Sequence, residues 1–110
     1  MMGIIKNMDA ERILNLKDEI HVMKGQVVSK TLVQNKAMNM TLFAFDKDEE
    51  ISSHKSDGDA FVQVLEGRGK YTVDGKEYIL EAGDSLIMPA GKPHAIYSVE
   101  AFKWLLTVVF

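Results

Sequence analysis

The sequence predicts a single all-β domain, a sandwich or barrel of short strands. Short runs rich in β-branched and aromatic residues recur from residue 20 to the end, separated by turn residues. Asp74-Gly75 stands between two alternating runs, as a tight hairpin requires. The last run is apolar on both faces from Trp104 on, so both of its faces must be covered. Many short strands at close spacing are typical of sandwiches and barrels.

Composition restricts the class of protein further. A chain of 110 residues can bury one core, and 46% apolar with 26% charged residues is ordinary for a globular domain. The net charge of −3, with lysines mixed among acidic residues, leaves no basic stripe for nucleic acid. Without cysteine there is no disulfide, zinc–thiolate site or thiol nucleophile. No run resembles a signal peptide or a membrane span, so we expect a cytoplasmic protein with no membrane partner.

Residues 1–25 are expected to form an N-terminal extension to a barrel domain at 26–110. Asp9 could cap a helical turn that runs through Leu14, or residues 12–16 could form an edge strand; the pattern leaves both open. The acidic run at 46–50 is expected to be a solvated loop.

The remaining elements follow from alternation and turn residues. The hairpin at Asp74-Gly75 sets Tyr71 across from Tyr78. Strands are expected at 20–23, 26–33, 38–45, 60–66, 70–73, 76–80, 85–88, 94–98 and 102–109.

The segment 83–94 carries the most specific motif. Gly83, Pro89, Gly91 and His94 follow the spacing glycine, five residues, proline, one, glycine, two, histidine. A Gly-Asp turn enters a strand, proline and glycine form a rigid corner, and the next strand begins near the histidine. This resembles the second motif of the cupin superfamily, with Ser98 where the family usually has asparagine.

The first cupin motif is matched only in part, over residues 48–67. The family pattern reads glycine, five residues, histidine, one, histidine, three or four, glutamate, six, glycine. His54 and Gly67 match it; Asp48, Ser56 and Ala60 replace the first glycine, the second histidine and the glutamate. The resemblance covers roughly residues 26–110 and implies a jelly-roll barrel of the small, single-domain, RmlC-like cupin kind.

In cupins with the intact set, three imidazoles and a carboxylate hold a divalent ion of iron, manganese, nickel, copper or zinc. The resemblance implies metal-ligand roles here for His54 and His94 alone, with water completing the shell. Strand alternation turns Asp59 and Gln63 outward, so neither replaces the missing glutamate. A bulge at 57–58 would bring one of them inward.

The barrel pocket is expected to centre on His54 and His94, with Ser56 as a small polar filler. The alternative is that both histidines are rim residues satisfied by backbone or water. His21 lies far from either motif and is expected to face solvent. The expected pocket walls are Met40, Met88, Tyr97 and Trp104.

Three functions compete. Loss of half the ligand set favours a module that binds a small organic or sugar-like ligand in the barrel. The second is a metal-dependent dioxygenase, decarboxylase or isomerase that uses His54 and His94. The third is metal-free acid–base catalysis, which resembles the sugar epimerases of this fold and would pair a histidine with Tyr71, Tyr78 or Tyr97.

A homodimer is expected because one barrel interior cannot cover both faces of every strand. Residues 104–110 have no polar face except Thr107, and Phe61 and Leu65 lie on the outer side of their strand. Small cupins that resemble this chain commonly pair in this way, and often exchange an N-terminal strand, which residues 1–25 could supply.

Overall fold

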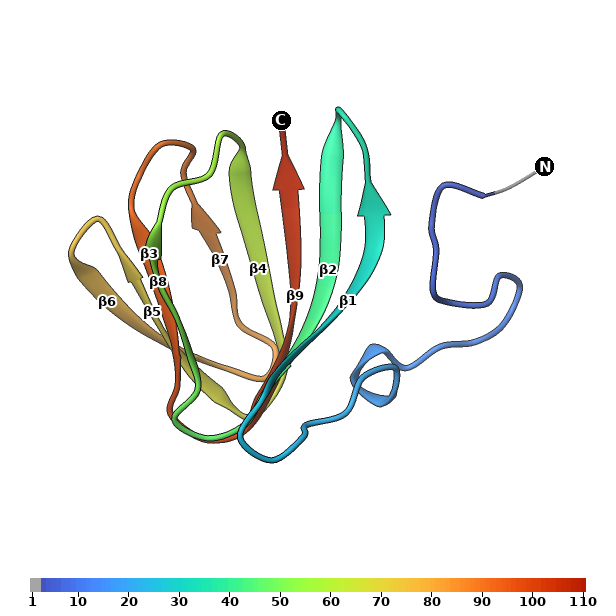
Figure 1. The fold of residues 1–110 in the computed structure, drawn as a ribbon, viewed down its shortest axis with the longest axis horizontal. Coiled ribbons are helices and arrows are strands. Elements are labelled where there is room, and N and C mark those ends of the chain that lie inside the picture. Colours follow the sequence, from blue (N-terminus) through green and yellow to red (C-terminus); the bar gives the residue numbers. More distant parts are fainter. Residues whose placement is uncertain (1–2) are drawn as a thin grey trace.

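The computed structural model describes residues 3–110, in which nine strands and one 3-10 turn, η1 (Leu16–Asp18), are found (Figure 1). The strands are β1 (Val27–Gln34), β2 (Met38–Phe45), β3 (Glu50–His54), β4 (Asp59–Glu66), β5 (Arg68–Val73), β6 (Lys76–Glu81), β7 (Ser85–Met88), β8 (His94–Ser98) and β9 (Phe102–Val109).

The strands form two antiparallel sheets that face each other. One has the order β1-β2-β9-β4-β7 and the other β3-β8-β5-β6. Non-consecutive neighbours such as β2 with β9 and β5 with β8 show that the chain crosses repeatedly between the sheets, as in a jelly roll. The all-β prediction is confirmed, and β2, β7, β8 and β9 have the predicted bounds.

Two local predictions were wrong, and one strand was not predicted. Residues 20–23 form no strand; Ile20 is buried against the outer side of a sheet instead. The segment before η1 is neither a helix nor an edge strand. The structure also contains β3, which the sequence pattern missed because Glu50–His54 carries a single apolar residue, Ile51.

The predicted β5–β6 hairpin is confirmed. Asp74 and Gly75 both have positive φ, 50° and 82°, and Tyr71 lies opposite Tyr78. Two positive φ angles in a two-residue turn match the right-handed twist of the flanking strands, which explains the Asp-Gly pair.

The main hydrophobic cluster fills the space between the sheets. Trp104 is its largest buried side chain and stacks on Phe43 at 4.6 Å between ring centroids. Phe102 lies so close to β5 that a Cβ on Gly69 would meet its ring at 2.4 Å. A residue with a side chain at position 69 would therefore displace the ring.

A second cluster lies outside the barrel, where the N-terminal extension covers the five-stranded sheet. Ile20 packs there with Leu42 and Leu105, and Leu65 joins from β4. The Nζ of Lys103 donates a 2.6 Å hydrogen bond to the carbonyl of Lys17 and fixes the extension to β9. The extension of the same chain thus buries Leu105 and half-buries Leu65, part of the surface that was expected to face a second copy.

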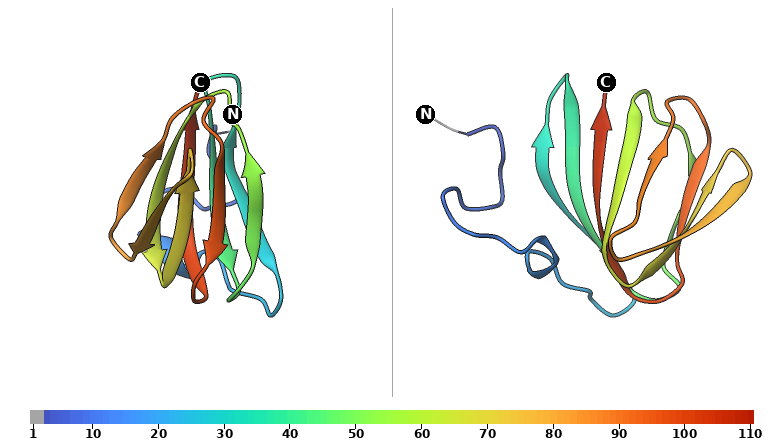
Figure 2. Two further views of the ribbon diagram at one scale, coloured as in Figure 1. Left: turned by 90° about the vertical axis from the view of Figure 1, so that its left-hand side faces the viewer. Right: turned by 180° about the vertical axis from the view of Figure 1, so that it is seen from behind.

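Nearer the N-terminus, the extension follows the free edge of β1. The amide of Lys6 donates a 2.8 Å hydrogen bond to the carbonyl of Leu32, at a bulge where the β1–β2 register shifts. The first part of the extension lies beside β1, outside the two sheets (Figures 1 and 2). Within residues 3–110, no helix has the length and apolar character needed to cross a membrane.

Candidate functional site

The corner between β7 and β8 positions His94. The carboxylate of Asp59 accepts a 2.8 Å hydrogen bond from the amide of Ala90, and the amide of Gly91 donates one of 2.8 Å to the carbonyl of Ser56. Both bonds fasten the corner to the start of β4 and the segment that precedes it. The first residue of β8, His94, is therefore held at a fixed place at the end of the barrel.

A bulge in β3 positions His54. Ile51 lies opposite Ile96, but His54, three residues later, lies opposite His94, only two residues before Ile96. Simple alternation from Ile51, which packs against the main cluster, would turn His54 to the other face. The extra residue in the bulge corrects the phase and brings the two imidazoles together.

The two rings meet edge to face. Their Nε2 atoms are 3.1 Å apart, and the ring centroids are 4.3 Å apart with an interplanar angle of 71°. The Nδ1 of His54 lies 3.0 Å from the carbonyl oxygen of Ser52, and that of His94 lies 3.3 Å from the carbonyl oxygen of Lys92. The structure thus brings together the two histidines that the motif spacing selected.

These contacts decide the protonation of the rings. A carbonyl oxygen can only accept, so each Nδ1 holds the proton and donates it. In a neutral ring the Nε2 is then a bare acceptor, and two acceptors face one another at 3.1 Å. Such a contact becomes favourable when the two nitrogens share a proton, or when both bind one donor group or one cation placed beside them.

The surroundings of His94 favour its neutral form. Burial, and then the positive charge of nearby His54, lower the pKa of His94, while its hydrogen bond to the Lys92 carbonyl opposes them. Only 3% of His94 is exposed, whereas His54 is exposed at the barrel end. The pair therefore offers a buried acceptor beside a solvent-accessible imidazole.

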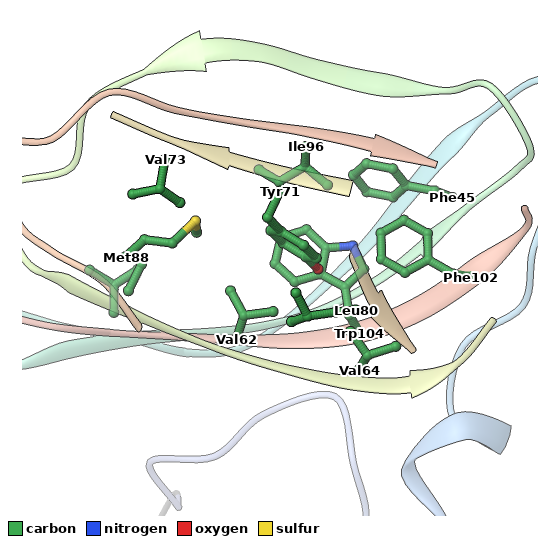
Figure 3. Packing of buried hydrophobic residues seen from close by; sticks show 12 residues of the cluster. Phe45, Val62, Val64, Tyr71, Val73, Leu80, Met88, Ile96, Phe102 and Trp104 are labelled. Carbon is green, nitrogen blue, oxygen red and sulfur yellow. The ribbon is translucent and has the colours of Figure 1, made fainter. Parts of the chain in front are cut away.

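The remaining predicted pocket residues have different positions. Ser56 lies between β3 and β4, and its Oγ accepts a 3.2 Å hydrogen bond from the amide of Gly58. Met88 and Trp104 are inside the barrel, each 1% exposed in the main cluster. Figure 3 shows Met88 directed toward Val73, at the opposite end of the cluster from Phe45 and Phe102.

Met40 does not line the barrel interior. It packs on the second cluster, on the outer face of the five-stranded sheet with Leu42. Counting along β2 explains the difference, because Phe43 and Phe45 face the main cluster and the even-numbered residues must face away. The expectation for Met40 was therefore wrong.

Asp59 and Gln63 face outward from β4, as alternation predicts, while Ala60 and Val62 are buried. No inward shift of β4 occurs after Gly58. Asp59 does not replace the missing glutamate ligand. Its carboxylate instead supports the β7–β8 corner.

The three tyrosines make no hydrogen bond with either imidazole among the described residues. Tyr71 is fully buried, and burial raises the pKa of its hydroxyl well above the usual value. Tyr97 does not line the barrel: its hydroxyl donates to the carboxylate of Asp48, and this bond raises the pKa of Tyr97. Tyr78 lies at the edge of the main cluster.

The donor set does not fit a metal ion held by protein alone. Two nitrogens 3.1 Å apart suit two adjacent positions of an octahedral ion, since ligands at about 2.1 Å and right angles are about 3.0 Å apart. However, residues 3–110 contain no group of three or more histidine, cysteine, aspartate or glutamate side chains arranged to hold a metal. Buried Ala60 stands where a carboxylate would be needed.

Sequence reasoning missed the parts of the site that belong to the backbone. The carbonyls of Ser52 and Lys92 orient the rings, but a backbone acceptor leaves no trace in residue type. The role of Asp59 was also missed. Asp59 directly precedes the predicted strand at 60–66, but no feature of the sequence relates it to the corner at Pro89.

A jelly-roll barrel with two imidazoles at one end is the class of protein that this fold and site define. A family model described as "Cupin domain" matches residues 41–109. The chain belongs to the cupin superfamily.

Solved structures agree with this assignment. A conserved protein of unknown function from Streptococcus pyogenes is 42% identical with a TM-score of 0.96, covering 98% of this chain and 95% of that one. A cupin superfamily protein from Desulfitobacterium hafniense is 32% identical with a TM-score of 0.93, covering 98% and 99%. A cupin 2 conserved barrel domain protein from Leptotrichia buccalis is 44% identical with a TM-score of 0.86, covering 88% of this chain and 47% of that one. None of the curated proteins matches the sequence.

Proposed function

We propose that the protein binds a small organic or sugar-like molecule that carries hydroxyl groups, at the His54–His94 end of the barrel. The observation that supports this is the pair of Nε2 atoms, 3.1 Å apart, whose Nδ1 atoms are held by backbone carbonyls. Both neutral rings present an acceptor at the same point. A hydroxyl group donates to such an acceptor, and convergent polar groups of this kind are typical of ligand sites.

The test is a titration with a panel of sugars, polyols and sugar acids, followed by NMR of the imidazole Hε1 protons. At least one hydroxylated compound is expected to shift the resonances of both His54 and His94, and His54→Ala should abolish that binding. His21→Ala is the matched control because His21 is exposed and lies outside the site. A panel that moves neither resonance, or a ligand that binds His54→Ala as tightly as the wild type, would contradict the proposal.

A metal-dependent enzyme that uses His54 and His94 is the second candidate, and the spacing of the two Nε2 atoms favours it. Two neutral imidazoles without a carboxylate hold a divalent ion weakly, with water or substrate completing the shell. Calorimetric titration with Zn²⁺ or Mn²⁺ is therefore expected to give weak binding that His94→Ala removes and Asp59→Asn leaves unchanged. Tight binding at one equivalent that requires Asp59 would disagree with the observed direction of that side chain.

We also propose that the protein is a homodimer. Support comes from a cross-strand row on the outer face of the five-stranded sheet, in which Phe61 lies opposite Ile87 and Thr107. Phe61 is 39% exposed and Ile87 60% exposed, and Ile13 of the extension is 98% exposed. Burying Phe61 and Ile87 against a second copy in a closed twofold interface would remove this apolar row from water.

A further inference from the structure

The two sheets are not joined by strand pairing between β6 and β7, and a cleft lies there. β6 is the last strand of one sheet and β7 the last strand of the other, so each pairs on one side only. A cavity of about 310 Å³ lies between these strands and the β7–β8 corner. Figure 1 shows both strands on the side of the barrel away from β1. Neither His54 nor His94 lines this cavity.

The inner wall of the cleft is apolar. Val73, Tyr78, Leu86 and Pro89 line it. Val73 belongs to the main cluster, and Tyr78 and Leu86 pack against that cluster while remaining half-buried. Because these side chains are supported from behind by the core, the wall is rigid. An aromatic or branched aliphatic group placed there would exchange water for contact with an aromatic ring and three aliphatic side chains.

The rim of the cleft is positively charged. Lys76, Lys92 and Asp74 line it, which gives two ammonium groups and one carboxylate. The Nζ of Lys92 is 3.7 Å from the carboxylate of Asp74, so the charges of these two residues neutralise one another. The Nζ of Lys76 instead lies 5.8 Å from the centroid of the Tyr78 ring, above the apolar wall. An excess of one positive charge therefore lies beside the aromatic surface.

From this juxtaposition we propose that the cleft between β6 and β7 is a second binding site, specific for a small carboxylate with an aromatic or branched apolar body. The apolar body packs on Tyr78 and Leu86, and the carboxylate lies at Lys76. The volume is at the lower end of the range for ligand sites, about 300–1,000 Å³, which suits a small acid and excludes a large cofactor. The site is separate from the proposed function of the histidine pair.

The test uses 3-phenylpropionate as the probe and 3-phenylpropanamide as its neutral match, titrated into the ¹⁵N-labelled full chain. The acid is expected to shift the amide resonances of Lys76, Tyr78, Ile87 and Lys92, and to bind at least three-fold more tightly than the amide. Lys76→Gln should weaken the acid about three-fold without changing the affinity for the amide. The single variant Lys92→Gln should weaken binding of the acid more than Lys76→Gln does, because the Asp74 carboxylate then repels the carboxylate of the acid without its own ion-pair partner.

Two controls separate this site from the histidine pair. Lys55→Gln removes an exposed lysine from the segment after β3, outside the cleft, and should leave the affinity unchanged. His54→Ala should also leave it unchanged. Equal affinity for the acid and the amide, or full affinity in Lys76→Gln, would overturn the proposal. Shifts confined to His54 and His94 would overturn it as well and would instead support the ligand site at the barrel end.

Discussion

The backbone carbonyls of Ser52 and Lys92 determine what His54 and His94 can do. By accepting from Nδ1, they leave Nε2 as the free nitrogen of each ring. The rings then compete for one proton across a distance of 3.1 Å. Burial lowers the pKa of His94 and so favours its neutral form, in which Nε2 is an acceptor.

This arrangement predicts a dependence of stability on pH. The pKa of His94 in the folded protein is lowered from 6.5, so the unfolded chain binds the proton more readily at that position. Stability contributed by neutral His94 is therefore present above pH 6.5 and falls as the pH drops from there toward the lower folded pKa. Urea unfolding at several pH values should show this decrease in the wild type and a smaller one in His94→Gln.

NMR titration supplies an independent check on the cause. His54→Gln removes the like charge that contributes to the lowering, so the pKa of His94 should rise in this variant. It should nevertheless stay below the usual value, because burial is the larger cause. A pKa of His94 that does not respond to His54→Gln would mean that the two rings do not interact in solution.

At the scale of elements, two local irregularities build the site. A bulge in β3 corrects the phase of His54, and the β7–β8 corner delivers His94 opposite to it. The corner depends on contacts with the other motif, since the Asp59 carboxylate and the Ser56 carbonyl each bind one of its amides. The two motifs of the sequence are thus parts of one hydrogen-bonded unit.

Asp59→Ala should therefore loosen the corner. The variant loses a charge-assisted hydrogen bond to the Ala90 amide at an exposed position, which we expect to lower the free energy of unfolding by about 1 kcal/mol. Urea unfolding measures this, and the Hε1 resonance of His94 should shift in the same variant. Gln63→Ala is the matched control, since Gln63 also faces outward from β4 and is exposed. Equal stabilities of the two variants would remove the proposed role of Asp59.

At the scale of the whole molecule, the barrel interior and the extension share the burial of apolar surface. The main cluster lies between the sheets, and the extension covers Leu105 and Leu65 from outside. Phe61, Ile87 and Ile13 remain exposed after both. A charge at Leu105 would therefore test folding, whereas a charge at Phe61 or Ile87 tests assembly.

Light scattering at low micromolar protein should give the mass of a dimer. Phe61→Glu and Ile87→Glu are expected to shift it toward the monomer without a large change in the unfolding midpoint, because both side chains are already partly in water. Ile79→Glu, on exposed β6 of the other sheet, is the matched control and should leave the mass unchanged. A wild-type monomer, or a dimer that tolerates both substitutions, would contradict the proposed interface. The mass of Ile13→Glu, measured in the same way, tests whether the extension, residues 1–25, contributes to the dimer interface.

The sequence by itself determined the strands and one hairpin, and the resemblance of its two motifs to those of the cupins selected the barrel and the pair His54 and His94. Alternating runs and the Asp74-Gly75 turn specify strands and one hairpin locally, so β2, β7, β8 and β9 were predicted to the residue. The spacing around Pro89 and Gly91 similarly fixed the place of His94. These features depend on short-range chemistry, namely side-chain period and backbone φ, which can be read from neighbouring residues.

Only the tertiary structure decided the rest. The polar strand β3 exists because β8 pairs with it, and the phase of His54 depends on a bulge that pairing reveals. Met40 was assigned to the wrong side of its sheet, since an apolar residue has the same pattern whether the barrel interior or the extension covers it. The direction of Asp59 toward Ala90, 31 residues away, likewise requires the folded chain. Contacts between distant segments decide each of these features, and a sequence read along its length does not contain them.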